Sequence, residues 1–127
     1  MKYPCEWLRK ARADIEASGI TLERGLADIA ASHAQQAAEK SLKALLAAVN
    51  KRPPKTHDID YLADRLEEAG VKIPMRDEIS LLTIYAVETR YPGPPITVEE
   101  AEYAYKLARD LLENIEKEME RRGIKCK

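Results

Sequence analysis

Hydrophobic residues recur along this chain at the spacing of α-helices, and helix-breaking residues divide the pattern into five segments. The first helix is expected over about residues 4–18, with Gly19 as its stop. The second is the longest and is expected to run from an N-cap at Thr21 to about residue 50. Its apolar positions predict a buried stripe that comprises Leu26, Ile29, Ala37, Leu42, Leu45 and Val49.

Proline and glycine delimit the next two helices. The Arg52-Pro53-Pro54 sequence ends the second helix, because a residue that precedes proline avoids the α conformation. A third helix is expected to open at Thr56 or Asp58 and to close at Gly70. A fourth is expected over about residues 75–89, before a proline-rich loop.

The fifth helix has the clearest local signal. Thr97 at the N-cap and Glu100 three residues later form a capping-box pattern, and Gly123 marks the end of the helix. No segment shows the alternating pattern of a strand. The sequence therefore predicts one all-α domain over residues 1–127, an up-and-down antiparallel helical bundle of four to five helices.

Composition excludes several classes of protein. The chain has 127 residues, of which 45% are hydrophobic, so it can bury a core. Its formal net charge of -1 provides no overall field for nucleic acid or anionic membranes. The N-terminus lacks an apolar signal region, and no apolar run approaches the ~20 residues of a membrane helix. These features predict a cytoplasmic protein without membrane contact.

The cysteines, Cys5 and Cys126, lie near opposite ends of the chain. They lack metal-ligand spacing, and two isolated cysteines do not make a secreted disulfide scaffold. The histidines, His33 and His57, have no carboxylate at the spacing that metal-binding helices use. We therefore expect no metal site and no cofactor.

The second helix carries more polar groups than a core helix needs. One face holds residues at i, i+3, i+7 and i+10, namely His33, Gln36, Lys40 and Lys43, and the neighbouring row holds Gln35 and Glu39. One interpretation is a solvated face on which Glu39 and Lys43 form an ordinary ion pair, worth roughly 0.2–0.5 kcal/mol. The other is that these amides and ammonium groups bind a phosphate or nucleobase, or pair with another subunit.

Two further segments offer candidate chemistry. His57 suits a helix-capping region or general acid–base work, since its unperturbed pKa lies near ~6.5. Arg90 could satisfy the last carbonyls of the fourth helix or offer a planar fork to phosphate. Tyr91 follows it and precedes the stiff proline loop.

Taken together, three segments resemble the HEPN domain (higher eukaryotes and prokaryotes nucleotide-binding), in its small stand-alone prokaryotic branch. They are AQQAAEK with LKALL over residues 34–46, KTHD over residues 55–58 and TRYPG over residues 89–93. An opening helix with Trp7, Ala11 and Asp14 also fits. The resemblance covers nearly the whole chain.

The resemblance implies a homodimeric helical bundle with a cleft along the dimer axis and a role in binding nucleotide or RNA. It also implies a minimal nucleotidyltransferase as partner, in a toxin–antitoxin-like module. The ligand-binding candidates are then His33, Gln36, Lys40, Lys43, Arg90 and Tyr91.

Many HEPN members are metal-independent ribonucleases that use an arginine followed, after four to six residues, by a histidine near the start of the last long helix. Arg90 lies in the corresponding region, but no histidine follows it. Arg52 and His57 match the bare spacing at a different place, between the second and third helices. We therefore expect binding without strong nuclease activity. The alternatives are a ribonuclease that uses Arg90 with His57 or His33, and a non-catalytic dimerisation module in which the second helix forms the seam.

Overall fold

The computed structural model describes residues 3–88 and 92–126, and in these ranges the chain forms helices and loops without strands. The predicted all-α bundle is therefore confirmed. In chain order the elements are α1 (Tyr3–Glu23), α2 (Ala27–Ala48), α3 (Ile59–Glu68), α4 (Arg76–Ile79), the 3₁₀ helix η1 (Ser80–Ile84), α5 (Tyr85–Glu88) and α6 (Val98–Arg121).

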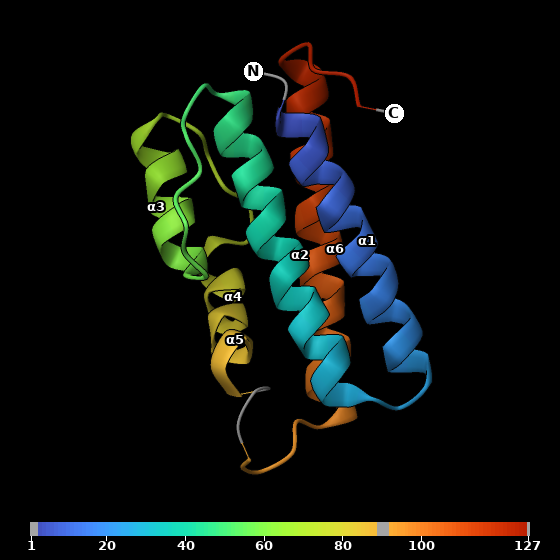
Figure 1. The fold of residues 1–127 in the computed structure, drawn as a ribbon. Helices are drawn as coiled ribbons and strands as arrows, with labels where there is room; N and C mark the ends of the chain where they lie inside the picture. The colour runs from blue at the N-terminus through green and yellow to red at the C-terminus, as the bar shows by residue number, and fades with distance from the viewer. Residues whose placement is uncertain (1–2, 89–91, 127) are drawn as a thin grey trace.

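The long helices α1, α2 and α6 pack side by side, and α1 runs antiparallel to the other two (Figure 1). α2 is central, because it also contacts α3, η1 and α5. The core between these helices is built mainly from fully buried aliphatic side chains, including Leu8, Leu42, Leu45, Leu46, Leu62, Leu66, Leu111 and Ile115. None of the helices in the described ranges is both long enough and apolar enough to cross a bilayer.

The segment over residues 51–58 runs back alongside α2, so α3 begins beside the middle of α2 and points in the same direction (Figure 1). A hydrogen bond fixes this return: the side-chain amide of Gln35 donates to the carbonyl oxygen of His57 over 3.3 Å. The 51–58 segment thereby places His57 beside the middle of α2 rather than at the C-terminal end of that helix. α4, η1 and α5 then run in the opposite direction (Figure 1).

The boundary between the first two helices differs from the prediction. α1 continues through Gly19 to Glu23, and Thr21 is no N-cap, since its hydroxyl donates within α1 to the carbonyl of Ala17 over 2.7 Å. Gly19 instead lies where α1 approaches α6 closely: a Cβ built there would be in tight contact with the Tyr105 ring, at 3.3 Å. The turn is made at Gly25, whose φ of +77° favours glycine.

The predicted buried stripe of α2 is wrong at its beginning. Leu26 precedes the helix and is 48% exposed, and Ile29 is 46% exposed. The stripe is made there by small residues, Ala30, Ala31, Ala34, Ala37 and Ala38, before it continues with Leu42 and Leu45. Alanine lets neighbouring helices approach closely, and hydropathy ranks it below leucine and isoleucine. The hydropathy pattern therefore predicted burial of Leu26 and Ile29, whereas the smaller alanines are the residues that are buried.

The predicted fourth helix is three short helical turns. Ile79 and Leu82 are both buried, and a separation of three residues fits a 3₁₀ helix as well as an α-helix. Arg76 joins this unit to α3 by ion pairs, at 2.6 Å to Asp60 and 2.7 Å to Asp64. The Ser80 hydroxyl, 2.5 Å from Asp60, and Arg76 hold the pKa of Asp60 below its ordinary value. The predicted end near Thr89 lies outside the described residues.

The strongest capping signals are confirmed. The Thr97 hydroxyl accepts from the Glu100 amide over 3.1 Å, and the Glu100 carboxylate accepts from the Thr97 amide over 3.2 Å. Asp58, not Thr56, caps α3, and its carboxylate accepts from the Tyr61 amide. Local side-chain chemistry therefore sets both helix beginnings.

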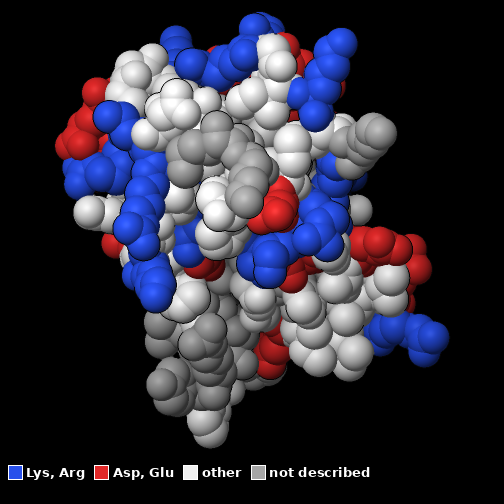
Figure 2. Space-filling view, turned by 45° about the horizontal axis from the view of Figure 1, so that its top comes forward, with Lys and Arg blue, Asp and Glu red and all other residues white. Residues whose placement is uncertain are grey.

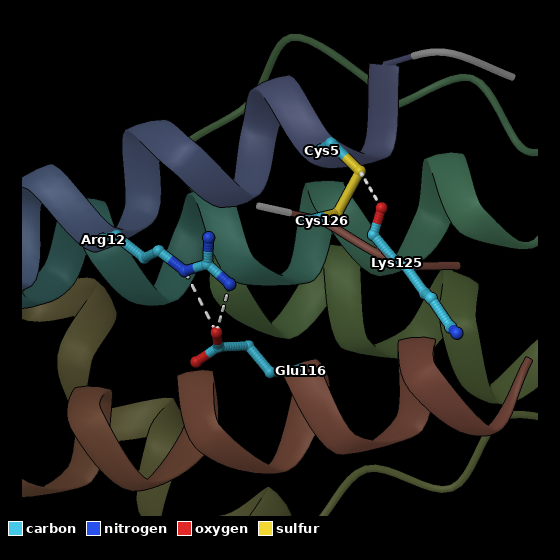
Figure 3. The surroundings of a disulfide bond; sticks show 5 residues. All are labelled: Cys5, Arg12, Glu116, Lys125 and Cys126. Atoms are coloured by element: carbon cyan, nitrogen blue, oxygen red, sulfur yellow. Dashed lines mark hydrogen bonds and ion pairs between the residues drawn. A yellow bond between two sulfur atoms is a disulfide. The ribbon is translucent and has the colours of Figure 1, made fainter. Parts of the chain in front are cut away.

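A disulfide joins the two ends of the chain (Figure 3). Cys5 lies in the first turn of α1, Cys126 lies in the tail after α6, and their Cα atoms are 5.3 Å apart. Nearby, the Arg12 guanidinium on α1 binds the Glu116 carboxylate on α6 over 2.5 Å (Figure 3). The sequence did not indicate this cross-link, because the spacing of two cysteines says nothing about their proximity in space.

Candidate functional site

The candidate polar residues of α2 lie along a strip between α1 and the 51–58 segment, which flank α2 on its two sides (Figure 1). We call this surface the α2 strip and define it by His33, Gln35, Gln36, Glu39, Lys40 and Lys43. Its side chains form two hydrogen-bonded networks, one around a carboxylate of α1 and one around a carboxylate of α2 itself.

The first network centres on Asp14, which is only 8% exposed. The Lys40 ammonium donates to one carboxylate oxygen of Asp14 over 2.6 Å, and His33 Nδ1 lies 3.0 Å from the other. An ionised carboxylate can only accept, so Nδ1 carries the proton in this pair. The side chains of His33 and Lys40 remain 32% and 27% exposed, which leaves both accessible from one side. Gln36, beside them, donates to the Ser32 carbonyl and hydroxyl.

The second network centres on Glu39, which is 4% exposed. Its carboxylate accepts from the Lys43 ammonium over 3.0 Å, from His57 Nδ1 over 3.0 Å and from the Gln35 amide over 3.3 Å. The Lys43 ammonium also lies 5.3 Å from the centroid of the Trp7 ring on α1, within cation–π range.

The interpretation of these polar residues of α2 as a solvated face is therefore wrong for Gln35, Glu39 and Lys43, which are buried. The predicted Glu39–Lys43 ion pair is present, but both side chains are buried. Taking two charges out of water is unfavourable unless hydrogen bonds satisfy them, and Gln35 and His57 supply those bonds to Glu39. The network thus locks the 51–58 segment onto α2.

The two histidines share one arrangement. Each imidazole binds a buried carboxylate through Nδ1, and no described residue forms a hydrogen bond with Nε2. The side chain of His57 is 65% exposed, so most of it is open to solvent. A carboxylate that orients an imidazole in this way is the arrangement by which enzymes hold a general base in one tautomer.

Two of the predicted site residues cannot be placed relative to this strip. Arg90 and Tyr91 lie outside the described residues, so the structure relates neither of them to His33 or His57. Of the four predicted on α2, His33, Gln36 and Lys40 are partly exposed, and Lys43 is buried.

Asp14 is the member of the site whose role the sequence did not indicate, although the residue fits the resemblance. A signal was present: α1 buries Pro4, Leu8, Ala11 and Ser18, and Asp14 falls on the same face. A carboxylate at a buried helical position requires a partner, and the polar strip of the next helix offered cations.

The comparisons with known proteins agree with this architecture. A HEPN domain model matches residues 5–118. The chain belongs to the HEPN family. As a HEPN domain it aligns with the crystal structure of TT1696 from Thermus thermophilus at a TM-score of 0.80 and 30% identity, over 92% of this chain and 98% of that one.

A second solved structure, ST0689, an archaeal HEPN homologue, aligns at a TM-score of 0.71 over 94% of this chain and 99% of the other. At 23% identity this likeness supports the fold alone. No curated protein matches the sequence. The family and the helical bundle expected from the sequence are confirmed.

Proposed function

We propose that this HEPN protein is a nucleotide- or RNA-binding subunit that acts as a homodimer with a minimal nucleotidyltransferase, in a toxin–antitoxin-like module, without strong nuclease activity. The observation that supports the binding of nucleotide or RNA is the Asp14 network of the α2 strip. The nucleotidyltransferase part rests on the family resemblance, and such a gene beside this one would support it.

The Asp14 network holds two cation-forming groups in fixed positions at a partly exposed edge. An ammonium group has three donors, and Lys40 uses one of them on Asp14. The remaining ammonium donors can therefore meet a phosphate oxygen, and Nε2 of His33 can donate to one when the imidazole is in its protonated form. Because Asp14 already orders both side chains, little conformational entropy is lost when a ligand binds. We propose that Arg90 adds a planar guanidinium to this site and that Tyr91 contributes its ring.

Thermal unfolding with and without nucleotide tests this binding. A ligand at 100 times its Kd stabilises the folded state by about 2.7 kcal/mol, which corresponds to a rise in Tm on the order of 10 °C. We expect a Lys40→Ala/Arg90→Ala variant to remain folded and to lose this rise. RNA oligonucleotides are tested in the same way.

An Arg9→Ala/Lys10→Ala variant is the matched control, because it removes the same charge from exposed positions of α1. It should keep the full nucleotide-dependent rise in Tm. A wild type that no nucleotide and no RNA stabilises would contradict the binding proposal.

A metal-independent ribonuclease is the second candidate function, and the Glu39–His57 pair favours it. His57 presents an exposed imidazole that a buried carboxylate orients, as a general base for the attack of a ribose 2′-hydroxyl requires. If the guanidinium of Arg90 lies beside the phosphate under attack, it would stabilise the negative charge that develops there.

Cleavage of structured RNA in the presence of EDTA tests this mechanism. If His57 is the base, His57→Ala should lower the rate by at least about 100-fold, and Arg9→Ala/Lys10→Ala should leave it unchanged. The same assay on His33→Ala shows which of the two histidines acts as the general base. Cleavage that persists unchanged in a His33→Ala/His57→Ala variant would exclude both residues as the base.

Exposed apolar side chains support the homodimer. Leu26 and Ile29, at the beginning of α2, are about half exposed and line a shallow hollow with Pro95 and Ile96. Large aliphatic side chains that cluster on a surface are typical of subunit interfaces. If the protein were instead a non-catalytic assembly module with α2 as the seam, Gln36 and Lys40 would be covered by the second copy.

A further inference from the structure

The disulfide between Cys5 and Cys126 fastens the last residues of the described chain to the bundle. α6 itself is closed locally: the amide of Ile124 donates to the Met119 carbonyl over 2.9 Å, and Gly123 adopts a left-handed φ of +83°. The two residues after Ile124 have no regular structure, and within the described chain they form no backbone–backbone hydrogen bond. The cross-link therefore decides where this tail lies.

At its other end the disulfide fastens the first turn of α1, where Cys5 lies (Figure 3). The first four amides of an α-helix have no acceptor within the helix, so this turn frays most readily. The ion pair of Arg12 with Glu116 ties α1 to α6 about two turns further along. The cross-link thus joins two chain ends that local structure holds only loosely.

Trp7, two residues after Cys5, connects this turn to the Glu39 network of the α2 strip. Its ring packs against the core, and the Lys43 ammonium lies 5.3 Å from the ring centroid. Lys43 and His57 share one acceptor, because Oε1 of Glu39 lies 3.0 Å from Lys43 Nζ and 3.0 Å from His57 Nδ1. A displaced Trp7 would admit water to Lys43 and weaken its attraction to Glu39, since ion pairs are strongest where water is excluded. Through the shared oxygen, the change would reach His57.

The surroundings of the disulfide suit thiol exchange. Both cysteines are partly exposed, so a reductant can reach the bond while the core stays folded. Lys and Arg side chains are prominent on the end of the molecule that carries the two chain termini (Figure 2). Positive charge and a helix N-terminus both favour the thiolate form of a cysteine, and a sulfur leaves most readily as a thiolate. Cys5, in the first turn of α1, is therefore the better leaving group.

We propose that the Cys5–Cys126 disulfide is a redox switch that controls the Glu39–His57 pair through Trp7. Its reductant is a dithiol. One thiolate of the reductant attacks Cys126 Sγ, the bond to Cys5 Sγ breaks, and Cys5 leaves as a thiolate that takes up a proton.

The second thiol of the reductant then displaces Cys126 from the mixed disulfide. Two electrons and two protons have passed from the dithiol, which becomes a disulfide, to the protein, which gains two thiols. The tail and the first turn of α1 are released, Trp7 moves away from Lys43, and His57 meets a carboxylate whose charge Lys43 neutralises less. The switch acts on the histidine of the ribonuclease candidate, but it does not depend on any ligand of the α2 strip.

The first test is the rate at which dithiothreitol reduces the native protein, followed by alkylation and mass spectrometry. Ile59→Val on α3 is the matched variant, because it trims a fully buried side chain and raises the unfolded population by about two- to tenfold. It should leave the rate of reduction unchanged. A rate that rises in proportion to the unfolded population would show that the bond opens only on unfolding, and would overturn the proposal.

The second test follows the NMR signals of the two histidine rings at a fixed pH. Reduction should shift the His57 signal, and oxidised glutathione should restore it. The His33 signal is the internal control and should stay in place, because His33 binds Asp14 and not Glu39. Both signals come from folded molecules, so a shift reports local structure rather than lost stability. A His57 signal that does not move, or equal shifts of both histidines, would overturn the proposal.

Substitutions at position 7 test the path from the disulfide to His57. Trp7→Phe keeps an aromatic face beside Lys43, so reduction should still shift the His57 signal. Trp7→Leu removes that face and should place the His57 signal near its reduced position while the disulfide is intact. Cys5→Ser with Cys126→Ser should place it there without any reductant. If reduction of Trp7→Leu shifted the His57 signal as far as in the wild type, Trp7 could not be the link.

Discussion

Replacement of both cysteines, Cys5→Ser with Cys126→Ser, is expected to lower the free energy of unfolding by about 2–5 kcal/mol. The cross-linked residues are 121 positions apart, so the disulfide closes nearly the whole chain into one loop. A loop of that length restricts the unfolded ensemble strongly, and the 5.3 Å between the Cα atoms is ordinary for a disulfide. Urea unfolding of the wild type and the variant, both under oxidising conditions, measures the difference.

Reduction provides the internal control for this experiment. A thiol reductant should bring the wild type down to the stability of the double variant and should leave the variant unchanged. Equal unfolding midpoints in oxidised wild type and variant would contradict the expectation, and so would two titratable thiols in the purified protein.

The disulfide also bears on the cellular compartment. Reducing cytosol keeps most thiols free, with hyperthermophiles as an exception. The cytoplasmic location expected from the sequence stays a prediction, and thiol trapping in intact cells would show whether the bond persists there.

Loss of the Glu39 charge is expected to destabilise the fold by about 3–5 kcal/mol. In Glu39→Gln the side chain of Lys43, a residue that is 7% exposed, would remain buried without its anion, and His57 would lose its carboxylate acceptor. Adding Lys43→Met should recover most of this loss, since an apolar side chain of similar length then packs beside Trp7. Chemical unfolding of the two variants and of Lys43→Met completes a double-mutant cycle.

An exposed pair on α6 serves as the matched comparison. Glu118 binds Arg121 over 2.8 Å at i, i+3, and the Arg121 side chain is 68% exposed. Glu118→Gln should therefore cost less than about 1 kcal/mol. If Glu39→Gln proved as mild as Glu118→Gln, the buried network could not be what fixes the 51–58 segment.

The sequence was most informative where a few neighbouring residues decide the structure. The capping box of Thr97 and Glu100 specifies the beginning of α6 because its hydrogen bonds join residues three positions apart. The two prolines after Arg52 end the preceding helix by local steric exclusion. The Glu39–Lys43 pair could likewise be predicted, because residues four apart on a helix are always neighbours.

Predictions failed where a distant residue decides the structure. Gly19 locally indicates a helix stop, yet α1 continues through it to Glu23 and lies close to α6 there, since a Cβ at position 19 would be 3.3 Å from the Tyr105 ring. Leu26 and Ile29 were predicted to be buried, yet both are about half exposed, and alanines of α2 are buried instead. At Gly19 tertiary packing outweighed an intrinsic helix preference of about 1 kcal/mol.

The sequence by itself determined that the chain is helical and that α2 carries polar side chains, because these features depend on local spacing and composition. Its motifs indicated the HEPN family by resemblance, and the family model confirms this. Only the tertiary structure decided which groups meet: Asp14 with Lys40 and His33, Glu39 with His57, and Cys5 with Cys126. Such pairs join residues 18 to 121 positions apart. Their proximity is set by how whole helices pack and by where the 51–58 segment turns back, which no local pattern encodes.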